Sequence, residues 1–249
     1  PHLRDLFRDE GAGTYYRCKS VNRVIDEMRH LVKKYNPDYV NFNSETFLVK
    51  PVDKLKELAD AYKKHIGLPF WCQTRPETVT DEKIRILKEM NCQNTQFGIE
   101  HGNEDFRANV LKRRYTNEQM LEAFRIVENH GISYTVNNII GFPDETRELV
   151  FDTININRQI NPATMNVYFF TPYKGTQLHK YCIDKGYLDK DDRVHQLLDG
   201  VPLKMDSISY QELKGLQRTF PLYAKMPEDM FDQIRIAEKF DDAGNKMYE

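Results

Sequence analysis

Residues 68–102 read LPFWCQTRPETVTDEKIRILKEMNCQNTQFGIEHG, and this stretch decides the fold class. The apolar, aromatic run 68–72 predicts a strand. Thr80 then has the side chain of a helix N-cap, and the two acidic residues after it favour the first turn of a helix. Apolar residues follow at helical spacing, namely Ile84, Leu87 and Met90. A second strand at about 94–99 leads into Glu100, so the stretch predicts a βαβ unit.

The same alternation continues on both sides of this unit. Strands are expected to start near residues 39, 69, 94, 132 and 165, about one every thirty residues. Helices are expected between them: after Ser20, over about 52–66, after Thr80, after the capping box of Thr116 and Gln119, and over 145–160. Repeated right-handed βαβ units build a parallel sheet, either open or closed into a barrel. Five strands are too few for an eight-stranded barrel.

The chain is expected to have two parts. Residues 1–186 carry the strand–helix alternation and form the α/β part. Residues 187–249 are charged and are predicted to be mostly helical, for example over 210–222. The second part therefore reads as a C-terminal helical appendage.

The composition limits the classes of partner. The 249 residues are 40% hydrophobic and 30% charged, which is ordinary for a globular protein. With 36 basic and 38 acidic residues the net charge is −2, so no nucleic-acid partner is expected. No apolar run approaches the ~18 residues of a membrane span, so no membrane partner is expected either. The four cysteines form no C-x2-C pair, and such isolated thiols predict a cytoplasmic protein.

Polar residues follow the expected strands, where parallel α/β proteins place their chemistry. They are Asn43, Ser44 and Glu45; Thr74 and Arg75; Glu100, His101 and Gly102; Asn137, with Gly141-Phe-Pro-Asp-Glu beyond it; and the segment 171–176. Carboxylates, a cation, amides and glycines on one rim suit a polar, zwitterionic ligand that carries hydroxyl groups.

Plainer interpretations stand beside this one. Glu45 and Glu100 could pair with Arg75 in a purely structural network, and Gly141 could serve only a tight turn. His101 reads most simply as a solvated loop residue. The chain has no G-x-S-x-G elbow, H-E-x-x-H motif or Walker loop, so those catalytic classes are excluded.

Six motifs in order resemble those of radical S-adenosylmethionine (SAM) enzymes. They are YRCKSVNRVIDEM, VNFNSETFLV, WCQTRPETVTDEKIRILKEMNC, FGIEHGNEDF, NIIGFPDET and TPYKGTQLHKY, within about residues 15–188. The chain looks most similar to the group in which this domain follows a cobalamin-binding domain. The segment SYQELKGLQRTFPLYAKMPEDMFDQIRIAE also looks like the tail common in that group.

The resemblance implies a partial (β/α)6 TIM-like barrel and a C-x3-C-x2-C loop that holds a [4Fe–4S] cluster. No such motif occurs in the 249 residues. We therefore expect the first strand and the cluster loop to precede Pro1, and the chain alone to be inactive. Cys18 is then a variable position without a ligand role, and the chain itself supplies no metal ligand.

The resemblance also assigns SAM contacts residue by residue. Ser44 and Glu45 stand where the family has an acidic pair near the methionine amino group, although only Glu45 keeps the charge. Arg75 matches an arginine after the family's third strand, and Glu100 in GIEHG matches a polar contact in the family's GIESG, with His101 in place of its serine. The remaining matches are Lys112 to a basic position that meets the methionine carboxylate, Asn137 to a ribose-binding acid, and Gly141 to a glycine on the adenine side.

The resemblance implies an enzyme that cleaves SAM reductively at the cluster to start radical chemistry. Methyl transfer or rearrangement with cobalamin from an upstream domain is one form of it. A small-molecule substrate and an electron donor such as flavodoxin or ferredoxin are the expected partners. Two alternatives stay open: a non-catalytic barrel module that binds a ligand or partner, and a conventional (β/α)-barrel lyase or aldolase that uses Glu45, Glu100 and Arg75 in acid–base catalysis.

Overall fold

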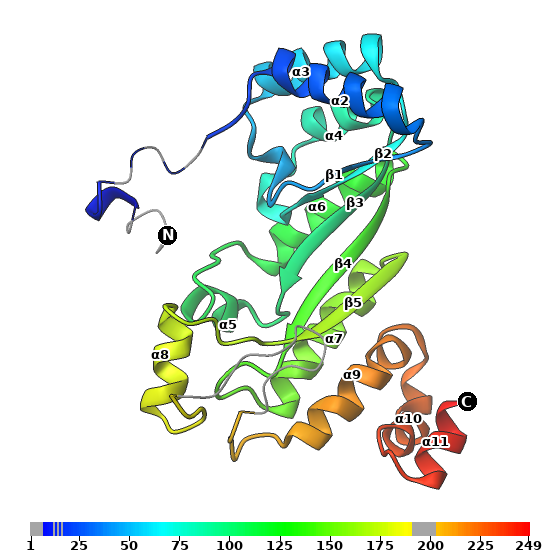
Figure 1. Ribbon diagram of the computed structural model, residues 1–249. Helices are drawn as coiled ribbons and strands as arrows, with labels where there is room; N and C mark the ends of the chain where they lie inside the picture. Colours follow the sequence, from blue (N-terminus) through cyan, green and yellow to red (C-terminus); the bar gives the residue numbers. More distant parts are fainter. Residues whose placement is uncertain (1–6, 12, 14, 16, 191–202) are drawn as a thin grey trace.

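The architecture is a single parallel sheet with helices packed along it (Figure 1). The computed structural model describes residues 7–11, 13, 15, 17–190 and 203–249. The strands are β1 (Val40–Phe42), β2 (Phe70–Thr74), β3 (Cys92–Glu100), β4 (Ser133–Ile140) and β5 (Thr164–Phe169). Every neighbouring pair is parallel and the order is β1-β2-β3-β4-β5. The predicted α/β class and parallel topology are therefore confirmed.

Seven helices accompany the strands. They are α2 (Val21–Tyr35), α3 (Val52–His65), α4 (Asp81–Glu89), α5 (Glu104–Asn109), α6 (Asn117–Asn129), α7 (Arg147–Ile160) and α8 (Gln177–Asp184). Five of these helices alternate with the strands as the periodicity predicts, and two short ones, α5 and α8, were not predicted. The predicted caps form: the side chains of Ser20, Thr80 and Thr116 accept hydrogen bonds from the first turns of α2, α4 and α6, and Gln119 completes the capping box. Local sequence therefore sets where these helices start.

Several element boundaries differ from the prediction by a few residues, such as the end of the helix Tyr210–Lys225 at residue 225 and not 222, and two of them lie beside the candidate site. Helix α7 starts at Arg147 and not at residue 145, because Thr146 is its N-cap and the Glu145 carboxylate binds backbone N–H groups of the preceding loop. Strand β2 covers Phe70–Thr74 and not 68–72. The later start of α7 leaves Glu145 in the loop that follows β4.

One face of the sheet is buried and the other is open. On β4 the residues Tyr134, Val136, Asn138 and Ile140 are buried, and the residues between them are half-buried. Successive side chains of a strand point to opposite faces, so this alternation means that helices cover only one face. The main apolar core lies under that face, between the sheet and helices α2, α3, α4 and α6.

The C-terminal helices share a second core with the sheet. Helices α9 (Tyr210–Lys225), α10 (Phe231–Ala237) and α11 (Asp242–Tyr248) complete the fold. Leu213, Leu216 and Phe220 of α9 pack with residues of β4, β5 and α7. Over residues 203–249 the predicted helical character is confirmed, whereas residues 191–202 lie outside the described residues.

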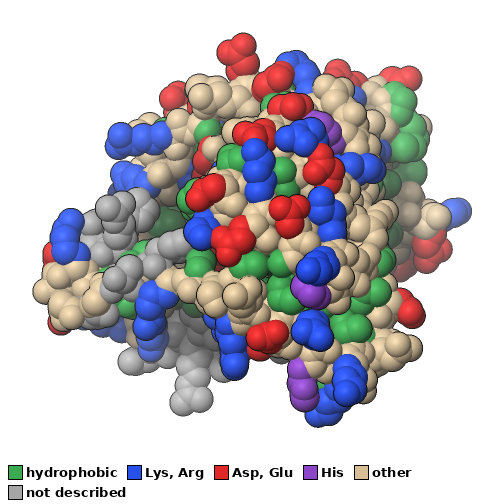
Figure 2. All heavy atoms as spheres, turned by 90° about the horizontal axis from the view of Figure 1, so that it is seen from above, with side chains coloured by type: hydrophobic (Ala, Val, Ile, Leu, Met, Phe, Trp, Pro, Cys, Tyr) green, Lys and Arg blue, Asp and Glu red, His purple; other side chains and the backbone are tan. Residues whose placement is uncertain are grey.

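The surface charges are mixed. Over much of the face seen in Figure 2, Lys and Arg side chains lie among Asp and Glu side chains. Surface ion pairs of the described residues include Lys56 with Glu82 at 2.6 Å and Arg85 with Glu89 at 2.6 Å. Charges of both signs are therefore mixed over much of this face. Among the described residues, no helix has both the length and the apolar character needed to cross a bilayer.

Candidate functional site

Glu100, the last residue of β3, has an unusual backbone. Its φ is +65°, and the register between β3 and β4 shifts between Gly98 and Glu100. The carboxylate folds back over Gly98, where a Cβ atom would lie 2.5 Å from Glu100 Oε1. A non-glycine residue in the left-handed region costs free energy and persists where the surrounding structure enforces it, often at functional sites. Gly98 is therefore the residue that makes room for the carboxylate.

Arg113 is the cation beside Glu100. Its Nη2 atom lies 2.9 Å from Glu100 Oε1, and its Nη1 atom donates to the Gly98 carbonyl at 3.0 Å. The predicted cation, Lys112, is exposed and has a φ of +58°. The structure thus brings Arg113, and not Lys112, into contact with the site carboxylate.

The electrostatics of Glu100 reflect both burial and neighbours. Burial raises the pKa of Glu100, and the positive charges of Arg113 and Arg75 offset part of that rise. Arg75, directly after β2, lies with its Nε atom 3.2 Å from Glu77 Oε1. Glu100 pairs with Arg113 and Arg75 with Glu77, so the network of Glu45, Glu100 and Arg75 considered above does not form.

Ser44 and Glu45 follow β1 at the same edge of the sheet. The Ser44 N–H donates to the Phe42 carbonyl at 2.8 Å, and Glu45 is exposed. Within the described residues, no hydrogen bond or ion pair joins either side chain to Arg75 or Glu100. These two residues are placed at the rim, but the protein itself does not connect them to the Glu100 pair.

Asn137 lies in a row of amide side chains on the open face of the sheet. Its Oδ1 atom accepts from Gln96 Nε2 at 3.0 Å and from Asn166 Nδ2 at 2.9 Å. Toward the other edge, Gln73 donates to Asn43 at 3.3 Å. These hydrogen bonds use only some of the amide donors and acceptors in the row. The remaining ones can bind a polar ligand on the open face.

Gly141 follows β4 and needs to be glycine for two reasons. Its φ is +81°, and a Cβ atom would lie 3.2 Å from Leu213 Cδ1 of α9. Its N–H donates to the Glu145 carboxylate, as does the N–H of Phe142 at 3.0 Å. The glycine therefore forms a tight turn around a buried carboxylate.

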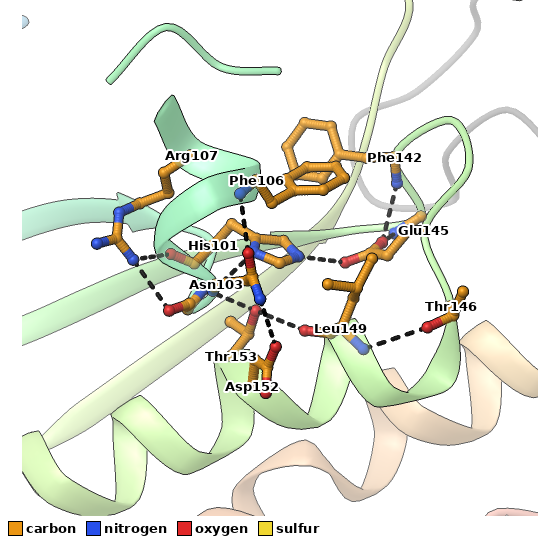
Figure 3. A network of polar contacts seen from close by, with 12 residues as sticks. His101, Asn103, Phe106, Arg107, Phe142, Glu145, Thr146, Leu149, Asp152 and Thr153 are labelled. Atoms are coloured by element: carbon orange, nitrogen blue, oxygen red, sulfur yellow. Dashed lines mark hydrogen bonds and ion pairs between the residues drawn. The ribbon is translucent and has the colours of Figure 1, made fainter. Parts of the chain in front are cut away.

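His101 is the largest departure from the sequence analysis. It was expected to be a solvated loop residue, but its side chain and that of Glu145 are both 0% exposed, and His101 Nε2 lies 3.0 Å from Glu145 Oε1 (Figure 3). The Asn103 N–H donates to His101 Nδ1 at 3.0 Å. Because Nδ1 accepts a hydrogen bond, the ring proton is on Nε2, and a neutral imidazole donates to the carboxylate.

Hydrogen bonds and close packing fix the loop that carries His101. The buried guanidinium of Arg107 donates to the carbonyls of His101 and Gly102, at 2.9 and 3.0 Å. The Gly102 N–H donates to Thr153 Oγ1 of α7 at 2.9 Å, and a Cβ atom on Gly102 would lie 2.1 Å from the Asp152 carbonyl oxygen. The turn between β3 and α5 therefore packs directly on α7.

Several of these residues were missed in the sequence. Arg113 stands one position after the predicted cation, and a turn decides which of two adjacent side chains points inward. Glu145 was noted only as part of the motif after Gly141. The period-two alternation on β3 points to Glu100 but to neither of these two residues.

The comparison with known families decides the class. The family described as the Radical SAM superfamily matches residues 7–155 of the 249 residues, which is more than half of the chain. The chain belongs to the radical SAM superfamily. This agrees with the order of motifs and with the parallel sheet, and it confirms the predicted resemblance.

Individual relatives point in the same direction. The uncharacterized methyltransferase PH0819 of Pyrococcus horikoshii is 26% identical over 223 residues, covering 89% of this chain and 48% of that protein. TsrM of Kitasatospora setae, a radical SAM methyltransferase solved with cobalamin and a [4Fe–4S] cluster, has a TM-score of 0.56 at 18% identity, covering 66% of this chain and 34% of that one. The cobalamin-dependent enzyme OxsB has a TM-score of 0.53 at 12% identity, covering 93% and 41%. The two solved structures show a shared fold. This chain spans about half the length of PH0819 and a smaller share of TsrM and OxsB.

The superfamily uses SAM and a [4Fe–4S] cluster, and TsrM and OxsB also bind cobalamin. The described residues contain no group of three or more His, Cys, Asp or Glu side chains arranged to hold a metal. Of the four cysteines, Cys18 is exposed and Cys72, Cys92 and Cys182 are buried as free thiols. These residues do not fit the cluster.

Proposed function

We propose that this chain forms the SAM-binding part of a radical SAM enzyme. The observation that carries the proposal is the Glu100–Arg113 pair at the end of β3, formed at a strained backbone position and largely buried, with side-chain exposures of 18% and 24%. A carboxylate and a cation side by side match a ligand that itself carries an ammonium and a carboxylate.

The roles of the two charged groups follow from their hydrogen-bonding capacity. Arg113 binds Glu100 through Nη2 and Gly98 through Nη1, and a guanidinium has further N–H donors for the methionine carboxylate. Glu100 uses one oxygen for Arg113 and offers its second oxygen to an ammonium or ribose hydroxyl. Arg113 thus takes the role that the resemblance gave to Lys112.

The rest of the ligand is proposed to run along the neighbouring strands. Asn137 and the amide row face the open side of the sheet, where the ribose and a polar substrate would lie. Gly141 marks the adenine side, and Ser44, Glu45 and Arg75 would complete the methionine side from β1 and β2. These assignments rest on the rim position of the residues and on the family resemblance.

The proposed reaction of the longer protein is reductive cleavage of SAM. A [4Fe–4S] cluster, which the described residues do not hold, would supply the electron for this cleavage. None of the residue roles above depends on that step. Cobalamin-dependent methyl transfer is the preferred form, because PH0819 and TsrM are described as methyltransferases and TsrM was solved with cobalamin. A flavodoxin or ferredoxin would supply the electron, in a cytoplasm that keeps the buried cysteines reduced.

The lyase alternative has less support. It requires Glu45, Glu100 and Arg75 to cooperate, but Glu100 binds Arg113, Arg75 binds Glu77, and Glu45 is exposed. Iron and sulfide, measured after anaerobic reconstitution of the longer protein to which we propose this chain belongs, separate the alternatives. A lyase or a non-catalytic module would retain neither.

Binding of SAM tests the proposal directly. We expect Arg113→Leu to weaken SAM binding in calorimetry by about ten- to a hundredfold, the range for loss of a hydrogen bond to a charged group. Lys112→Leu is the matched control, because it removes an exposed neighbouring cation, and its affinity should stay within about twofold of the unmodified protein. Glu100→Ala should also weaken binding. Equal affinities for all four proteins, or a loss confined to Lys112→Leu, would refute the assignment.

A further inference from the structure

The His101–Glu145 pair connects the ends of two strands that carry separate parts of the proposed SAM site. His101 directly follows Glu100 at the end of β3, and Glu145 binds the N–H groups of Gly141 and Phe142 at the end of β4. One chain of hydrogen bonds therefore runs from Asn103 N–H through the imidazole to the carboxylate and into the second loop.

This chain of contacts leaves the Glu145 carboxylate fully satisfied. Its Oε1 atom accepts from His101, and its Oε2 atom accepts from two backbone N–H groups. A buried carboxylate that loses one of its donors is disfavoured, so the hydrogen bond from His101 stabilises the shape of the loop around Glu145. The imidazole is the one side chain among these donors.

Aromatic packing fixes the imidazole itself. The His101 ring stacks on Phe106 of α5, with centroids 4.3 Å apart and planes at 22°, and lies edge-on to Phe142 at 6.1 Å. Phe106 and Phe142 also contact each other at 5.5 Å. Residues from α5 and from the loop after β4 thus enclose the ring and couple the two segments.

We propose that His101 is a positioning residue, whose neutral imidazole, by donating to Glu145, holds Glu100 at a fixed distance from the Gly141 turn and so pre-forms the site for the adenosine part of SAM. This inference rests on the proposed function and extends it to a residue that touches no ligand. SAM must reach from Glu100 and Arg113 to the end of β4, so its affinity depends on the relative position of the two strand ends.

Two substitutions separate the hydrogen bond from simple packing. In His101→Gln the amide nitrogen takes the place of Nε2 and can still donate to Glu145, whereas in His101→Asn the shorter side chain reaches only the position of Nδ1. The probes are SAM and 5′-methylthioadenosine, which lacks the amino-acid end. We expect His101→Asn to bind both about tenfold more weakly, and His101→Gln to bind both within about threefold of the unmodified chain. His130→Leu, which breaks an exposed His–Asp pair with Asp81 at 2.8 Å, is the matched control and should bind both normally.

The outcomes distinguish this inference from the proposed function. If the unmodified chain binds neither probe, the proposed function and the positioning role of His101 are both refuted. If it binds and the two His101 variants behave alike, whether normal or impaired, the positioning role is wrong. Nitrogen-15 NMR of the unmodified chain adds a test that needs no variant to fold: the His101 ring must show a protonated Nε2 and an unprotonated Nδ1, and the opposite tautomer or an imidazolium would overturn the inference.

Discussion

The Glu100 carboxylate lies 2.9 Å from the Arg113 guanidinium, and the same guanidinium donates to the Gly98 carbonyl at 3.0 Å. The pair therefore closes a small ring around the end of β3, in which Arg113 holds both the side chain of Glu100 and the backbone two residues before it. This arrangement explains how a non-glycine residue keeps a φ of +65°.

The pH dependence of stability should report the burial of Glu100. Burial raises the pKa of this carboxyl group, so the folded state holds the proton more tightly than the unfolded chain does. Its stabilising contribution is present below the unfolded pKa and is lost as the pH rises through the folded pKa. We expect the free energy of unfolding of the unmodified chain to fall relative to that of Glu100→Gln as the pH rises from about 4 toward neutrality, measured by urea denaturation. Glu82→Gln is the control. The hydrogen bond to Lys56 lowers the pKa of Glu82, so the free energy of unfolding of the unmodified chain should rise relative to that of Glu82→Gln over the same pH increase.

Two glycines beside the site should respond differently to the same substitution. In Gly102→Ala the new methyl group would meet backbone, 2.1 Å from the Asp152 carbonyl oxygen, and we expect a loss of about 3 kcal/mol of stability. In Gly98→Ala it would meet only the end of the Glu100 side chain at 2.5 Å, which can rotate away, and we expect less than about 1 kcal/mol.

The affinity for SAM should rank these two variants in the opposite order to their stability. Gly98→Ala pushes the Glu100 carboxylate away from Arg113, so it should weaken SAM binding although the fold tolerates it. Thermal unfolding and calorimetry on the two variants check both parts. A Gly98→Ala protein that unfolds far below Gly102→Ala would mean that Glu100 cannot rotate away and that the site is more rigid than these contacts require.

The parts of the structure that sequence reasoning reached are those set by local chemistry. Ser20, Thr80 and Thr116 cap their helices because the cap requires only a side chain three residues before its partner. His101 and Glu145 are 44 residues apart, and nothing near either residue indicates that they meet. The choice of Arg113 over Lys112 depends on a turn with positive φ at Lys112, which neither propensity nor spacing predicts.

The ion pair of Arg147 should contribute far more to the free energy of unfolding than a surface ion pair does. Arg147 starts α7 and binds Glu238 at 2.5 Å and Glu212 at 3.1 Å, with side-chain exposures of 17% for Arg147 and 10% for Glu238. Arg147→Met leaves the Glu238 carboxylate buried without its cation, and we expect a loss of about 3 kcal/mol in urea denaturation. Arg125→Met breaks an exposed pair with Glu122 and should leave the midpoint unchanged. Similar losses in both variants would contradict the assignment of a buried bridge.

Helix α9 should unfold together with the sheet. Leu216 is 0% exposed and lies in the core that α9 forms with β4, β5 and α7. Leu216→Ala removes buried methyl groups from that shared core, so it should cost about 2–5 kcal/mol and shift one cooperative transition. Leu31→Ala, at a leucine that is 50% exposed on α2, is the control and should change little. Circular dichroism and the fluorescence of Trp71 on β2 report different parts of the fold. Coincident transitions would show that the C-terminal helices and the sheet are one cooperative unit, whereas a separate early transition for α9 in Leu216→Ala would mean that the second core does not hold the helix on the sheet.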